Sequence, residues 1–226
     1  MNDLTTPHFA DACLRLGVPL RLAPAGIVPL DSAHRIAGPA VPVRHVGSVD
    51  IFIEAIHGAP PGSVLVIDNE GRTDEGCIGD LTALEAKAAG LAGIVVWGLH
   101  RDTAELHEVG LPIFSYGRCP AGPRRPAYEP SRMVSEIDFG GARVSGEDVV
   151  VADADGVLFL PAADLDSITR MARTIATRER EQAAAVARGT TLYEQLQFER
   201  YVSRRAEDPS HTFRQHLREL GGAIEE

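Results

Sequence analysis

Two strand-length apolar runs with a helix between them constrain the fold of this chain more than any other feature. Residues 63–68 and 92–98 are apolar through their centres, as expected of strands buried on both faces of a sheet. Residues 81–89 are predicted to form a helix that ends at Gly90. Residues 111–115 have the composition of a third strand. This order predicts βαβ organisation with right-handed crossovers, and therefore an α/β fold.

Short elements are expected before this unit. The 22 glycines and 15 prolines of the 226 residues are spread along the chain, which favours many short elements over a helical bundle. Residues 7–16 are predicted to form a helix stopped by Gly17. Residues 36–44 are predicted to form a strand, and residues 50–57 a helix with one apolar face.

The C-terminal part predicts a hairpin and a long helix. Residues 148–152 and 157–160 flank an Asp-x-Asp-Gly turn, which is typical of a β-hairpin. The turn also resembles the start of a calcium loop, but the remaining ligands of the twelve-residue pattern are missing. Residues 164–188 are predicted to form a charged helix ended by Gly189, followed by a polar segment that is helical in part.

The composition argues against several classes of partner. With 32 acidic and 22 basic side chains the net charge is −10, which disfavours nucleic-acid binding, and 5% aromatic residues provide few stacking platforms. The longest apolar run, residues 88–99, is shorter than the ~20 residues of a membrane helix. The N-terminus lacks a signal-peptide layout, and three widely spaced cysteines suit a reducing compartment. We therefore expect a cytoplasmic protein without nucleic-acid or membrane partners.

One spacing points to a chemical site. Asp80 opens the helix that follows the first strand, and twenty residues separate it from the pair Arg101-Asp102, which follows the second strand. The helix travels about 15 Å at ~1.5 Å per residue, and the strand returns about the same distance at ~3.3 Å per residue. Asp80, Arg101 and Asp102 are therefore expected at the same end of the sheet, where α/β proteins bind ligands.

Each residue type at this end suits a role in binding an anion or a cation. The carboxylate of Asp102 can hold a hard divalent cation together with waters. The Arg101 guanidinium can donate hydrogen bonds to a carboxylate or to a developing enolate oxygen. The N–H groups of Leu81 and Thr82 lie at a helix start, where anions bind. Glu105 can orient Arg101 or a water.

A purely structural interpretation of the same residues stays open. Asp80 is a favoured residue for a helix N-cap. Thr82 and Glu85 have the spacing of a capping box. Arg101 and Asp102 can simply form a solvated turn after the strand.

The residues around this spacing resemble the family of regulators of ribonuclease E activity A. Most of residues 5–190 share the likeness. Within the family, the chain is similar to the aldolase branch that acts on 4-hydroxy-4-methyl-2-oxoglutarate and 4-carboxy-4-hydroxy-2-oxoadipate, which carries Asp, twenty residues and Arg-Asp. The similar segments are residues 36–40, 79–81, 93–96, 101–106, 110–115 and 149–157.

The resemblance implies a fold and an assembly. It implies a swivelling β/β/α domain over residues 1–189. It implies a homotrimer or a dimer of trimers, with Mg²⁺ or Mn²⁺ bound at the subunit interface. Residues 190–226 are then a C-terminal tail, partly helical, that packs on a neighbouring subunit.

The resemblance also implies residue roles. Asp102 ligates the metal directly, and Asp80 holds a water that the metal binds. Arg101 contacts the oxygen of a pyruvate-like substrate, and the backbone amides of Leu81 and Thr82 hold the substrate carboxylate.

A glutamate from the C-terminal helix of a neighbouring subunit is further implied to reach the site through water. The candidate is Glu179, with Glu181 in reserve. The alternative for both is a helix surface with ordinary i,i+4 pairs.

Some features depart from the family pattern or remain open. Residues 117–132 are rich in Pro and Arg and do not follow the aldolase pattern. Their Arg118, Arg124 and Arg125 are candidates for binding a second carboxylate or a phosphate, or else belong to a solvated turn.

Three further side chains near the motif carry alternatives. His100 and His107 are candidate acids or bases near neutral pH, with a packing role as the alternative. Cys77 is interpreted as a small packed residue.

The expected function is therefore a divalent-metal-dependent lyase that cleaves a 4-hydroxy-2-oxo acid to pyruvate through an enolate. Oxaloacetate decarboxylation passes through the same enolate and is the expected side activity. One alternative is a non-catalytic protein that binds and regulates a ribonuclease. Another is a lyase of the same family that acts on a different substrate.

Overall fold

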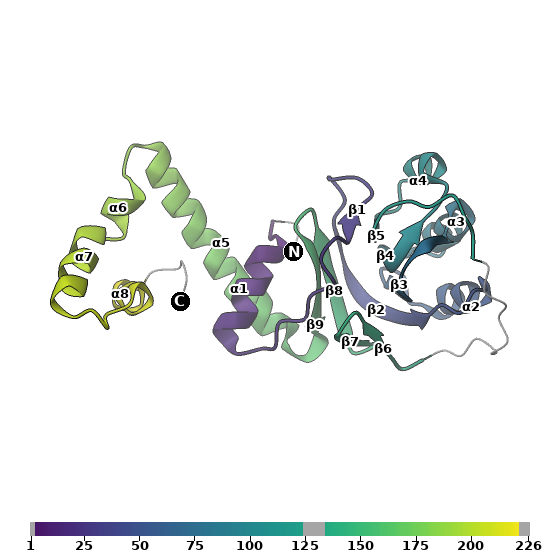
Figure 1. Cartoon of the computed structure of the whole chain (residues 1–226), viewed down its shortest axis with the longest axis horizontal. Helices are drawn as coiled ribbons and strands as arrows, with labels where there is room; N and C mark the ends of the chain where they lie inside the picture. The colour runs from purple at the N-terminus through teal and green to yellow at the C-terminus, as the bar shows by residue number, and fades with distance from the viewer. Residues whose placement is uncertain (1–2, 124–133, 222–226) are drawn as a thin grey trace.

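The computed structural model describes residues 3–123 and 134–221 (Figure 1). A seven-stranded sheet has the order β1-β5-β4-β3-β2-β8-β9, and β6 and β7 form a separate hairpin. Strands β2 to β5 run parallel to their neighbours in this set, which confirms the predicted βαβ organisation. The strands are β1 (Val28–Pro29), β2 (Ile36–Arg44), β3 (Val64–Ile78), β4 (Gly93–His100), β5 (Ile113–Ser115), β6 (Glu136–Phe139), β7 (Ala142–Ser145), β8 (Asp148–Asp153) and β9 (Gly156–Pro161).

Two groups of helices pack beside different strands of this sheet. In Figure 1, α2, α3 and α4 lie beside β3 to β5, whereas α1 and α5 lie beside β8 and β9. Strands β8 and β9 pair antiparallel, as the hairpin prediction required. The helices are α1 (Thr6–Leu16), α2 (Asp50–Gly58), α3 (Asp80–Ala88), α4 (Thr103–Val109), α5 (Leu165–Ala187), α6 (Leu192–Gln195), α7 (Phe198–Glu207) and α8 (Phe213–Leu220), with a 3-10 turn over Ala162–Asp164.

Both faces of the central strands are buried. Along β3, Leu65 and Ile67 pack against α2 to α4, whereas Val64 and Val66 pack in a second cluster with β6 and β7. A third cluster joins β8 and β9 to α1 and α5 through side chains such as Ile175. The continuous apolar composition of this strand therefore follows from burial on two sides.

Strand β3 is much longer than predicted. It continues to Ile78, ten residues beyond the apolar run, through a polar segment whose pairing with β4 shifts register after Asp68, Arg72 and Gly76. These irregularities remove the regular alternation by which a strand is recognised in sequence. The extension carries the chain directly to the start of α3.

The start of α3 corrects two capping predictions. The N-cap is Gly79, in extended conformation, and Asp80 is the first helical residue. Asp80 as N-cap is therefore wrong. Thr82 then lies inside the first turn, so the proposed capping box of Thr82 and Glu85 is wrong as well. The side chain of Asp80 instead accepts a hydrogen bond from the N–H of Leu81 at 2.8 Å.

The C-terminal segment forms an arm at the end of the molecule opposite to α2–α4. Helix α5 leads away from the sheet, and α6, α7 and α8 follow it (Figure 1). Phe198 and Tyr201 of α7 and Phe213 of α8 pack with their rings tilted or edge to face, the ring centroids 4.9 to 5.5 Å apart, and join these two helices. The prediction of a partly helical tail is confirmed. Among the described residues, no helix has the length and apolar character needed to cross a membrane.

Candidate functional site

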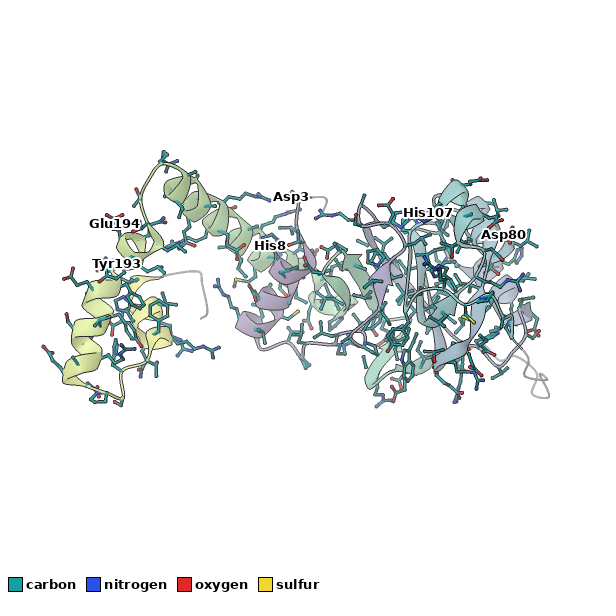
Figure 2. All side chains as sticks on the ribbon, turned by 45° about the horizontal axis from the view of Figure 1, so that its top comes forward. Asp3, His8, Asp80, His107, Tyr193 and Glu194 are labelled. Carbon is teal, nitrogen blue, oxygen red and sulfur yellow. The ribbon has the colours of Figure 1, made fainter. Side chains whose placement is uncertain are left out.

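The residues of the Asp80 to Arg101-Asp102 spacing meet in one pocket. A cavity of about 190 Å³ lies where β3 and β4 end and α3 and α4 begin. The expectation that the three side chains share one end of the sheet is confirmed. Figure 2 shows Asp80 at this end of the molecule. The cavity is lined by Val49, Gly76, Cys77, Ile78, Gly79, Asp80, Leu81, Thr82, Arg101, Asp102 and Pro123.

Asp102 has an unusual backbone that aims its carboxylate into the pocket. It is the N-cap of α4 with φ 57° and ψ 44°, the left-handed region that few non-glycine residues adopt but Asp tolerates. Its Oδ2 accepts a hydrogen bond from Nε of Arg101 at 3.0 Å. The Arg101 side chain is 45% exposed and that of Asp102 27%, so both remain accessible to a ligand.

Gly79 makes room for this carboxylate. A Cβ atom placed on Gly79 would lie 2.1 Å from Oδ2 of Asp102 and 3.3 Å from Cγ of Arg101. Any side chain at this position would therefore displace the acidic group. The missing Cβ opens a cradle between the start of α3 and Asp102, and sequence reasoning did not identify Gly79 as a site residue. No local signal marks this glycine, because the contact that requires it is with Asp102, far along the chain.

The start of α3 offers N–H groups to the pocket. Leu81 and Thr82 both line the cavity, in agreement with their predicted location. The N–H of Leu81 is already engaged by the carboxylate of Asp80. A substrate carboxylate at Leu81 would therefore have to replace the Asp80 side chain.

The segment after β5 forms one wall of the pocket. Pro123 lines the cavity, and a Cβ on Gly122 would lie 2.9 Å from Nη1 of Arg101. Arg118 is exposed and is not among the described residues that line the cavity. Arg124 and Arg125 lie outside the described residues.

The two histidines near the motif differ in environment. His100 is buried, and its Nδ1 lies 2.8 Å from Oγ of Ser115. Burial lowers the pKa of His100, and the nearby Arg118 and His107 lower it further. His107 is exposed on α4. Within the described residues neither histidine lines the cavity.

The remaining candidates lie in different places. Cys77 is buried, which agrees with a packed residue, and it also lines the cavity. Glu105 is exposed on α4. Glu179 lies on α5, where its Oε2 is 3.1 Å from Nε2 of His8, and Glu181 is exposed on the same helix. One chain alone therefore does not bring Glu179 or Glu181 to the pocket.

The donor set fits a hard divalent cation. Asp80 and Asp102 present carboxylate oxygens to one cavity, and the glycine cradle leaves space beside Asp102. Among the described residues no three His, Cys, Asp or Glu side chains converge as a ligand group. A site with one or two carboxylates is the kind that Mg²⁺ uses, because it keeps several of its waters.

Relatives of the chain include an aldolase by name. This chain is 30% identical over 148 residues to a Halalkalibacterium halodurans protein named "Putative 4-hydroxy-4-methyl-2-oxoglutarate aldolase". The match covers 65% of this chain and 70% of the relative.

Solved structures share the fold. A Pseudomonas syringae pv. tomato protein described as uncharacterized superposes with a TM-score of 0.74 at 27% identity, over 84% of this chain and 92% of that one. RraAS2 of Streptomyces coelicolor, described as an unusual member of the RNase ES inhibitor RraA protein family, has a TM-score of 0.67 at 25% identity, over 83% and 93%.

The family model described as "RraA-like: Aldolase/RraA" matches residues 6–159, which include every element of the pocket. The mixed α/β fold with a curled sheet agrees with the RraA structures. The chain therefore belongs to the RraA-like family.

Proposed function

We propose that this chain is a divalent-metal-dependent lyase that cleaves a 4-hydroxy-2-oxo acid and releases pyruvate. The observation that carries the proposal is the meeting of Asp80, Arg101 and Asp102 in one pocket beside a helix start. The similarity to proteins with aldolase names supports the same reaction class. Oxaloacetate decarboxylation is proposed as a side activity.

Two acidic residues of the pocket are proposed to bind the cation, and two backbone amides are proposed to bind the substrate. Asp102 would hold Mg²⁺ or Mn²⁺ directly and Asp80 would hold it through water. When bound, this metal supplies Lewis-acid stabilisation of negative charge. The N–H groups of Leu81 and Thr82 bind the substrate carboxylate at the positive end of the α3 dipole.

Arg101 acts where charge develops during the reaction. A base takes the proton of the 4-hydroxyl, the C3–C4 bond breaks, and its electron pair remains as the enolate of pyruvate. The Arg101 guanidinium stabilises the enolate oxygen. A water held by Asp80 then returns a proton to C3, which completes pyruvate and leaves the second product as a carbonyl compound.

Assembly is part of the proposal. We place the site in a homotrimer or a dimer of trimers, with Glu179 of a neighbouring subunit reaching the pocket through water. His8 contacts Glu179 within its own chain and holds the carboxylate on the surface of α5. The tail of residues 190–226 is proposed to pack on a neighbouring subunit. Among the described residues Cys13, Cys77 and Cys119 form no disulfide, which suits the proposed cytoplasmic location.

Pyruvate release tests the proposal. Pyruvate release from 4-hydroxy-4-methyl-2-oxoglutarate or oxaloacetate is measured in three cases: the wild-type protein with Mg²⁺, the wild-type protein with a chelator, and the Asp102→Ala variant with Mg²⁺. We expect turnover only in the first case, and Glu108→Gln, an exposed change on α4, serves as the control. Equal rates in all three conditions would contradict a metal-dependent lyase.

A second candidate function is binding to a ribonuclease, which the similarity to the Streptomyces coelicolor RraA protein favours. Capture of the ribonuclease on immobilised protein, together with no metal-dependent turnover, would support this candidate instead.

A further inference from the structure

A buried polar pair joins β4 to β5 behind the pocket. His100, the last residue of β4, is 4% exposed, and Ser115, the last residue of β5, is 2% exposed. Their side chains lie 2.8 Å apart, Nδ1 to Oγ. Nε2 of His100 is buried without a hydrogen-bond partner among the described residues. Since an aliphatic side chain would fill such a position without desolvating polar atoms, packing alone does not explain the histidine.

Ser115 sets the direction in which the chain leaves β5. Its Oγ accepts a hydrogen bond from the N–H of Gly117 at 3.1 Å and lies 3.3 Å from the Gly117 carbonyl oxygen. Gly117 has φ 119°, so the chain turns sharply here. The hydroxyl therefore connects the ring of His100 to the first turn of the segment that follows.

The segment then crosses the end of β4 and reaches β3. The N–H of His100 donates to the Gly117 carbonyl at 2.8 Å, and the N–H of Cys119 donates to the His100 carbonyl at 2.8 Å. The N–H of Gly76 on β3 donates to the Ala121 carbonyl at 2.7 Å. Residues 116–123, which we call the wall segment, are thus tied to both strands that end at the pocket.

The wall segment ends against the reactive residues. Gly122 lies beside the Arg101 guanidinium, and Pro123 lines the cavity. Arg101 directly follows His100 in the chain, and its N–H donates to the Ile78 carbonyl of β3 at 2.9 Å. A shift of the His100 and Ser115 pair would therefore move the wall segment relative to Arg101 and Asp102.

We propose that His100 and Ser115 are positioning residues that fix the wall segment against Arg101 and so set the width of the substrate pocket. The proposal rests on the proposed lyase function. Neither side chain lines the cavity, so their effect falls on substrate binding rather than on the bond-breaking step.

Steady-state kinetics with Ser115→Ala tests the positioning role. Loss of the hydroxyl, which contacts both His100 and Gly117, is expected to raise KM for oxaloacetate about tenfold while kcat stays within about twofold. Ser115→Thr keeps the hydroxyl and should retain the wild-type KM, and Glu108→Gln, an exposed change on α4, serves as control. An unchanged KM in Ser115→Ala, or a Ser115→Thr variant as impaired as Ser115→Ala, would overturn the inference.

Hydrogen exchange gives a readout that does not need turnover. In Ser115→Ala the amides of Gly117 and Cys119 should exchange about tenfold faster, whereas those at the centres of β3 and β4 should not change. Unchanged exchange at these amides would also overturn the inference. If the wild-type protein releases no pyruvate, the lyase proposal fails, and the exchange result still decides whether the pair holds the wall segment.

Discussion

At the residue scale, the pocket depends on two backbone features that bring Asp102 and the start of α3 together. The backbone of Asp102 adopts the left-handed conformation, and Gly79 lacks the Cβ atom that would collide with the Asp102 carboxylate. Asp80, Arg101 and Asp102 could be named from the sequence, because their spacing follows from the lengths of a helix and a strand. The cradle at Gly79 could not be named, because its need arises from a contact across twenty-three positions of sequence.

Gly79→Ala should remove activity without unfolding the protein. The added Cβ would lie 2.1 Å from Oδ2 of Asp102 and must displace the carboxylate. We expect kcat/KM for pyruvate release to fall by at least about a hundredfold, the size of effect that a 1 Å misplacement of reacting groups produces. Gly146→Ala, where a Cβ meets nothing within 4 Å, is the matched control. Wild-type kcat/KM in Gly79→Ala would show that the cradle is not needed.

Asp68 should make stability depend on pH. Burial raises the pKa of Asp68, although the Glu70 N–H and the nearby Arg44 act against this shift. A raised pKa means that the folded state binds the proton more tightly than the unfolded state. The stabilisation is present below the unfolded pKa and is lost as the pH rises through the folded value.

Asp68→Asn removes this proton linkage while keeping an oxygen for the Glu70 N–H. We expect the variant to be more stable than the wild type at pH 7, with an advantage that shrinks toward pH 4. Urea unfolding at both pH values measures the difference, and exposed Asp74→Asn is the control. A stability advantage of Asp68→Asn over the wild type that grows toward pH 4 would contradict a raised pKa of Asp68 in the folded state.

At the element scale, periodicity identified most of the fold. Strands β2, β4 and β5, the β8 and β9 hairpin, and helices α1, α2 and α5 all occur close to their predicted bounds. Periodicity failed in the second half of β3 and at the start of α3. In β3 the register shifts abolish alternation, and at α3 the helix begins one residue earlier than predicted because Gly79, rather than Asp80, adopts the extended N-cap conformation.

The attachment of α5 to the sheet is expected to depend on its buried stripe. Ile175 is fully buried in the apolar cluster that joins α5 to α1 and to the β8 and β9 hairpin. Ile175→Ala should lower the free energy of unfolding by about 2–5 kcal/mol, through lost apolar burial and the cavity left behind. Val186→Ala on the same helix, at an exposed position, should change it by less than about 0.5 kcal/mol. Denaturant unfolding followed by circular dichroism measures both, and equal effects would contradict the packing.

At the scale of the whole molecule, the pocket and the C-terminal arm lie at opposite ends. Figure 2 shows Asp80 near one end and Tyr193 and Glu194 at the other, with His8 between them. Glu179 lies next to His8, so a role for it at the pocket requires a second copy of the chain. In the proposed assembly the C-terminal end of one subunit meets the pocket end of the next, and such head-to-tail contacts close into rings when the rotation permits.

Mixing two inactive variants tests whether subunits share the site. Asp102→Ala removes the proposed metal ligand from the pocket, and Glu179→Gln removes the carboxylate that a neighbouring subunit is proposed to supply. If the site is shared, mixed assemblies contain some pockets with both groups intact, so unfolding and refolding the two variants together should restore part of the activity. Glu108→Gln, an exposed change on α4, mixed with Asp102→Ala gives the control for simple dilution. Activity of Glu179→Gln alone at the wild-type level would remove Glu179 from the proposal.

The sequence by itself determined the α/β class, the order of the central elements and the shared end of Asp80, Arg101 and Asp102. These follow from local periodicity and from the fixed rise per residue of helices and strands. The tertiary structure alone decided the cradle at Gly79, the wall segment held by His100 and Ser115, and the separation of Glu179 from the pocket. Each of these depends on a contact between residues far apart in the chain, and no local pattern of residues specifies such a contact.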